Sequence, residues 1–125
     1  MLIIRNHEIT PTATPGGNFT SGLATPSRGA QEVNVIRQHE MPGGHNPLHR
    51  HDREEVMVML AGSVTVTVDA VQETLQPGDT LIIPAQTLHQ IANGGHEPAE
   101  WLIIAPQGRR FFSASGEEAS PAWAQ

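Results

Sequence analysis

The sequence contains no cysteine, no lysine and no tyrosine, and only 4% of its 125 residues are aromatic. Without cysteine the chain can form no disulfide and can use no thiol in catalysis. Without lysine it can form no Schiff base, and without tyrosine it has no phenolic general acid. Any chemistry must therefore come from His, Glu, Asp or Arg side chains, or from a bound metal.

Long hydrophobic runs and basic clusters are also lacking. No stretch is long and apolar enough to predict a membrane span, and residues 1–5 do not resemble a secretory signal. We therefore expect a cytoplasmic protein with no membrane partner. The formal net charge is −6, and the largest basic cluster is Arg109-Arg110. We expect this pair to be solvated at the surface, and we expect no nucleic-acid partner.

Ten prolines and twelve glycines divide the chain into short segments. No window has a sustained apolar period of 3.6 residues, which argues against a helical bundle. Apolar and β-branched residues instead favour short strands at residues 30–37, 56–60, 64–68, 80–83, 89–92 and 101–105. Short strands separated by Gly/Pro turns predict an all-β sandwich or barrel.

The length fits one domain with two irregular ends. Residues 1–29 are predicted to form an N-terminal arm and loop, 30–108 the barrel, and 109–125 a C-terminal tail. Within this tail we expect Trp123 to act as an anchor, because its large ring has much apolar area to bury.

The sequence His49-Arg50-His51, followed by Glu55, is the strongest chemical signal. On an extended chain His49 and His51 point to the same face, because strand side chains alternate. Imidazole and carboxylate groups together can bind a divalent transition metal. If Glu55 faces a cavity, Met57 and Met59 share its parity and are predicted to line the pocket. Farther along the chain, Ile91 shares the parity of His89 and is predicted to line it too.

Two spaced motifs resemble those of the cupin family. Gly43, His49, His51, Glu55 and Gly62 stand at the spacing of the first cupin motif, and Gly78, Pro84, His89 and Asn93 at that of the second. One position departs from the pattern: Gln86 occupies a place where cupins usually have glycine. This departure puts the geometry of the local turn in doubt, but not the set of ligands.

The resemblance implies a jelly-roll barrel, the double-stranded β-helix, with a metal inside one end. By that resemblance the ligands are His49, His51, Glu55 and His89, holding a divalent iron, manganese, nickel, copper or zinc ion. The donor set does not choose among these metals. Many cupins are dimers in which an N-terminal arm packs across the interface, so we expect a homodimer.

Our leading hypothesis is an oxygenase-like enzyme that acts on a small organic molecule. In this hypothesis Glu55 is a ligand that also serves as a proton acceptor. Two alternatives stay open: a metal-dependent isomerase or decarboxylase, and a binding or sensing protein without catalysis. A phosphosugar substrate would need clustered positive charge, for which the sequence near the motifs offers only three arginines, Arg37, Arg50 and Arg53.

Overall fold

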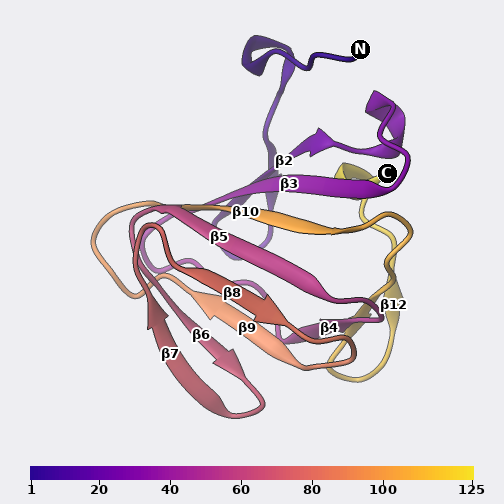
Figure 1. Cartoon of the computed structure of the whole chain (residues 1–125). Coiled ribbons are helices and arrows are strands. Elements are labelled where there is room, and N and C mark those ends of the chain that lie inside the picture. The colour runs from indigo at the N-terminus through magenta and orange to yellow at the C-terminus, as the bar shows by residue number, and fades with distance from the viewer.

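The computed structural model describes all 125 residues, which form two six-stranded antiparallel sheets (Figure 1). The strands of the first sheet are, in spatial order, β1 (Thr12–Thr14), β2 (Asn18–Ala24), β3 (Val33–Glu40), β10 (Ala99–Pro106), β5 (Glu55–Ala61) and β8 (Thr80–Ile83). Those of the second are β12 (Glu118–Ala119), β11 (Phe111–Ser113), β4 (His49–His51), β9 (His89–Ala92), β6 (Val64–Val68) and β7 (Val71–Leu75). The prediction of an all-β jelly-roll barrel is confirmed.

Helical structure is limited to three short 3-10 turns, η1 (Asn6–Glu8), η2 (Pro26–Arg28) and η3 (Ala122–Ala124). None of these is long or apolar enough to cross a membrane. All six strands expected from the apolar pattern are present, although their ends differ by up to three residues.

The sequence pattern missed strands at both ends of the chain. β2 pairs along β3 in the segment expected to be an arm or loop. Its inward side chains Asn18 and Thr20 are buried but polar, and the Thr20 hydroxyl donates to Gln38 Oε1 at 3.0 Å. Asn18 Nδ2 donates to the Pro15 and His45 carbonyls, each at 2.9 Å. These hydrogen bonds hold the polar side chains in place, so β2 joins the sheet without apolar alternation.

The C-terminal tail completes the second sheet. β11 pairs with both β4 and β12, and the yellow tail lies beside β4 in Figure 1. Trp123 in η3 packs edge-on against Phe111, with ring centroids 5.7 Å apart, and so anchors the tail as expected. Asn34 Nδ2 of β3 donates to the Ala124 carbonyl at 3.2 Å and holds the tail against the first sheet.

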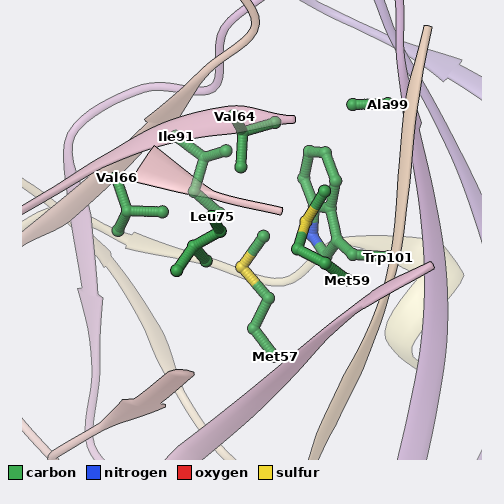
Figure 2. Close-up of a cluster of buried hydrophobic side chains, with 8 residues drawn as sticks. All are labelled: Met57, Met59, Val64, Val66, Leu75, Ile91, Ala99 and Trp101. Atoms are coloured by element: carbon green, nitrogen blue, oxygen red, sulfur yellow. The ribbon is translucent and has the colours of Figure 1, made fainter. Parts of the chain in front are cut away.

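One hydrophobic cluster, here called the core cluster, fills the barrel between the sheets (Figure 2). It consists of Met57, Met59, Val64, Val66, Leu75, Ile91, Ala99 and Trp101. The turn from β5 to β6 depends on Gly62, which has φ +68° and whose missing Cβ would collide with the Pro98 carbonyl. This close approach of two backbone segments explains why glycine is needed there.

Candidate metal centre

Three imidazoles converge at one end of the barrel, from two neighbouring strands. His49 and His51 lie on β4, and His49 is paired in register with His89 on β9. One ring nitrogen from each histidine lies within 4.8 Å of those of the other two. The strand pairing therefore brings together residues that are about 40 positions apart in the sequence.

Backbone carbonyls orient two of these rings. His49 Nδ1 lies 2.7 Å from the Pro47 carbonyl, and His89 Nδ1 lies 2.9 Å from the Thr87 carbonyl. Each Nδ1 therefore carries the proton, which leaves Nε2 as a free electron-pair donor. His89 Nε2 is buried and has no hydrogen-bond partner. A buried acceptor without a partner is a feature that a bound cation would explain.

The electrostatics keep these two imidazoles neutral. Desolvation, together with the neighbouring His89 and His51, lowers the pKa of His49 to about 4. Desolvation likewise lowers the pKa of His89, although the Thr87 carbonyl and Glu55 oppose it. Neutral imidazole is the form that ligates a metal, so His49 and His89 are in their binding form at neutral pH.

Glu55 begins β5 and lies against His51. Its Oε2 is 2.9 Å from His51 Nε2, yet the oxygen is buried and makes no hydrogen bond of acceptable geometry. Two donors that share one ion at about 2.1 Å, at right angles to each other, lie about 3 Å apart. The His51–Glu55 pair thus has the spacing of neighbouring ligands, and the residues present fit a divalent transition metal.

The charge of Glu55 is stabilised from several sides. Burial alone would raise its pKa, but the contact with His51 and the charges of His51 and Arg109 outweigh that effect and lower the pKa. Glu55 is therefore a carboxylate at neutral pH, the form that binds a cation.

Arg109 is a member of this site that the sequence analysis missed. We expected a solvated surface pair with Arg110, but the Arg109 side chain is only 3% exposed, and its Nε lies 3.8 Å from Glu55 Oε2. Its Nη1 donates to Asn34 Oδ1 at 3.0 Å, and the guanidinium lies 4.9 Å from the Phe111 ring centroid. The available signal was the strand parity that Arg109 shares with Phe111, opposite to that of Arg110 and Phe112.

A cavity of about 450 Å³ opens beside the histidines. Its apolar wall comes mainly from Ile91, Ile103, Phe111, Phe112 and Trp123, and its polar wall includes His49, His51, Glu55 and Arg109. This volume lies within the range of small-molecule sites, roughly 300–1,000 Å³.

The predicted pocket residues separate into two groups. Ile91 lies in the cavity wall, whereas Met57 and Met59 do not. Both methionines are at most 1% exposed and belong to the core cluster. They share the parity of Glu55 and face inward as expected. However, the barrel interior is filled at their level, because Trp101 and the side chains of β6 and β7 pack there (Figure 2).

The turn at Gln86 keeps the conformation that a glycine would favour. Gln86 has φ +63°, a left-handed value that costs a residue with a Cβ on the order of 1 kcal/mol. Its backbone N–H donates to the His51 carbonyl at 2.7 Å, and its side chain accepts from Arg50 Nε at 3.1 Å. These bonds offset the strain and connect the turn to the histidine strand.

Comparison with known proteins identifies the family. A cupin domain model matches residues 36–105. The chain belongs to the cupin family. This cupin is 31% identical to auxin-binding protein 1 of Arabidopsis thaliana over 114 residues, which is 82% of this chain and 58% of that protein. It is 30% identical to an uncharacterized protein of Methanocaldococcus jannaschii, over 84% of this chain and 87% of that protein. The chain spans about half the length of the auxin-binding relatives, from 43% to 58%.

Solved structures share the fold of this cupin. A polyketide cyclase from Streptomyces resistomycificus has a TM-score of 0.79 at 21% identity, covering 87% of this chain and 81% of the cyclase. A cupin sugar phosphate isomerase from Silicibacter pomeroyi has a TM-score of 0.72 at 22% identity, covering 94% of this chain and 90% of the isomerase. An oxalate oxidase has a TM-score of 0.76 at 22% identity, covering 90% of this chain and 63% of the oxidase. At these identities the likeness establishes the fold alone.

Proposed function

We propose that this cupin binds one divalent transition metal through His49, His51, Glu55 and His89 and uses it in an oxygenase-like reaction on a small organic molecule. The observation that carries the proposal is the buried His89 Nε2, which has no partner and shares one focus with the other two imidazoles. A metal held there would supply a Lewis-acidic centre for an anionic substrate oxygen and for dioxygen.

The side chains around the centre have separate tasks in this proposal. The aromatic rings of Phe111 and Trp123 bind the apolar body of the substrate and exclude water from it. Glu55 is the nearest carboxylate to the triad, so it is placed to accept a substrate proton when it leaves the metal. The Pro47 and Thr87 carbonyls keep the imidazoles in one orientation.

Oxygen uptake tests this proposal. Protein loaded with iron, manganese or copper is mixed with diketones, flavonols and catechols, and oxygen consumption is followed. We expect metal-dependent uptake with at least one class, and none from the His51→Ala variant treated in the same way. Wild-type protein that holds the metal but consumes no oxygen with any class would contradict the oxygenase-like activity.

A binding function without catalysis is the second candidate, and it rests on a different observation. Proteins named for auxin binding match most of this chain, and the cavity has an aromatic wall. Tight retention of a small molecule without turnover would favour this candidate. A phosphosugar isomerase is less well supported, because Arg109 is the only arginine in the cavity wall.

We also propose that the protein is a homodimer. Met1, Leu2 and Ile3 are exposed at the N-terminal arm, and Ile82 on β8 is 60% exposed. Burying these side chains against a second copy would remove apolar area from water. Sedimentation equilibrium should give twice the chain mass, and a single-chain mass at high concentration would contradict the proposal.

A further inference from the structure

Arg109 has unused hydrogen-bonding capacity inside the protein. A guanidinium has five N–H donors, and the only hydrogen bond of Arg109 goes from Nη1 to Asn34. Its Nε is buried without a partner, and the distance of 3.8 Å to Glu55 is too long for a hydrogen bond. A buried cation with unpaired donors indicates a missing acceptor.

The guanidinium is held in place independently of Glu55. Asn34 is itself fixed, because its Nδ2 lies 3.2 Å from both Gln107 Oε1 and the Ala124 carbonyl. Phe111 supports the other side of the guanidinium at 4.9 Å. Arg109 is therefore positioned before any ligand arrives, as a binding group needs to be.

The charge of the site favours an anion with one negative charge. The Glu55 carboxylate and the Arg109 guanidinium offset each other in charge, and a divalent metal bound through neutral imidazoles leaves the site positive. The remaining ionisable groups of the cavity wall, Glu117 and Glu118, are acidic and exposed. Glu118 is paired with Arg110 at 2.7 Å, so Glu117 is the carboxylate of this rim without a cationic partner. A dianion such as a phosphate ester would meet this acidic charge with Arg109 as the only arginine of the cavity wall.

We propose that Arg109 forms a carboxylate-binding subsite beside the metal, so that the ligand is a small organic monocarboxylate with an aromatic or apolar body. The carboxylate accepts hydrogen bonds from the free guanidinium N–H groups, while the body lies against Phe111 and Trp123. This inference rests on the proposed function for the position of the metal, but not for the anion contact itself.

The test compares carboxylates with their neutral amides. Benzoate, phenylacetate and hydrocinnamate are titrated against their amides, with phenyl phosphate as the dianion. Calorimetry and tryptophan fluorescence report binding to the full chain, both metal-free and zinc-loaded; of the two tryptophans, Trp123 lines the cavity. Arg109→Gln removes the guanidinium, and Arg53→Gln makes the same change at an exposed arginine outside the cavity wall.

We expect at least one carboxylate to bind about tenfold or more tightly than its amide, in both the metal-free and zinc-loaded protein. Arg109→Gln should abolish this preference in the metal-free protein and keep one zinc per chain, while Arg53→Gln should behave as wild type. Arg109→Lys should retain part of the preference, because it keeps the charge but loses the planar fork.

Three results would overturn the subsite. They are no preference for any carboxylate, a preference that appears only with zinc, and tighter binding of phenyl phosphate than of every carboxylate. If Arg109→Gln fails to fold by circular dichroism, the metal-free wild-type comparison and Arg109→Lys still decide the question. If the wild-type protein binds no zinc but still prefers a carboxylate over its amide, the proposed function is refuted and the carboxylate subsite is not.

Discussion

The metal region (His49, His51, Glu55 and His89) and the core cluster are built from the same strands but have opposite needs. β5 begins with Glu55 and continues inward with Met57 and Met59, and β9 begins with His89 and continues with Ile91. In the metal region, buried atoms such as Glu55 Oε2 and His89 Nε2 have no partner. Two residues farther along, about 7 Å, the side chains of the core cluster are apolar and pack against one another, and the buried Trp101 Nε1 is the one polar side-chain atom there without a partner. The comparison teaches that strand parity determines which side chains face the barrel interior. The depth of a side chain in the barrel then determines whether it can serve as a metal ligand or packs in the core.

The sharpest separation of the two regions should come from His49→Ala. Removing one of four ligands should weaken metal binding on the order of 100- to 1,000-fold. The free energy of unfolding of the metal-free protein should change by less than about 1 kcal/mol, because His49 is only partly buried. Zinc competition against a chelator and urea unfolding measure the two effects. The control is His96→Ala, at an exposed histidine outside the triad. Equal zinc affinity in the two variants would show that His49 is not a metal ligand.

Met57→Ala should do the reverse. The side chain is fully buried in the core cluster, so its truncation should lower the free energy of unfolding by about 2–5 kcal/mol. Zinc affinity of the folded protein should stay within about threefold of wild type, since Met57 contributes no donor. Val71→Ala, at a side chain that is 62% exposed, is the control and should cost less than about 1 kcal/mol. A loss of zinc affinity in Met57→Ala with unchanged stability would contradict the assignment of this residue to the core.

Glu40 is a buried carboxylate outside both regions. Its backbone carbonyl accepts a hydrogen bond from Asn93, the residue that follows the last residue of β9. Both oxygens of its carboxylate are buried without a partner. Burial raises its pKa to about 7, against a lowering effect of Asn93. The folded state therefore binds the proton of the Glu40 carboxyl group more tightly than the unfolded state does. The protonated group contributes fully to stability below the unfolded pKa of 4.5, and this contribution is lost as pH rises through about 7.

Glu40→Gln should therefore remove this fall in stability. Above pH 7 the variant should be more stable than wild type by up to ~3 kcal/mol, as measured by urea unfolding from pH 4 to pH 9. Glu32→Gln, the same change at an exposed position, should follow the wild-type curve. Parallel curves for wild type and Glu40→Gln would show that the buried carboxylate carries no such cost.

The smallest effect is expected at Gln86, the turn that supports the histidine strand. Gln86→Gly relieves the left-handed strain at φ +63° and should raise the free energy of unfolding by about 1 kcal/mol or less. Gln86→Ala keeps the strain and loses the hydrogen bond from Arg50, so it should not stabilise. Equal melting temperatures for these two variants would show that the backbone strain is negligible.

The sequence predicted those parts of the molecule whose signals are local. The spacing of His49, His51 and Glu55 follows from strand alternation and one turn, and the barrel strands carry apolar residues that alternate or run together. β2 escaped prediction because its inward residues Asn18 and Thr20 are polar and are held by side-chain hydrogen bonds.

The parts that escaped prediction depend on long-range pairing. Arg109 is buried only because β11 pairs with β4 and because Asn34, which is 75 positions away in the sequence, accepts its hydrogen bond. Likewise, strand alternation predicted that Met57 and Met59 face inward, but it could not predict the depth at which Trp101 fills the barrel. Depth and distant partners are properties of the assembled sheets, so no short window of residues reports them.

Anomalous X-ray scattering from crystals grown with zinc tests the central claim most directly. The account predicts one strong peak per chain, bonded to His49, His51 and His89 nitrogens at about 2.0–2.1 Å and to a Glu55 oxygen at about 2.0–2.2 Å. A map with no peak among these four side chains, in crystals where zinc is bound elsewhere or not at all, would contradict it.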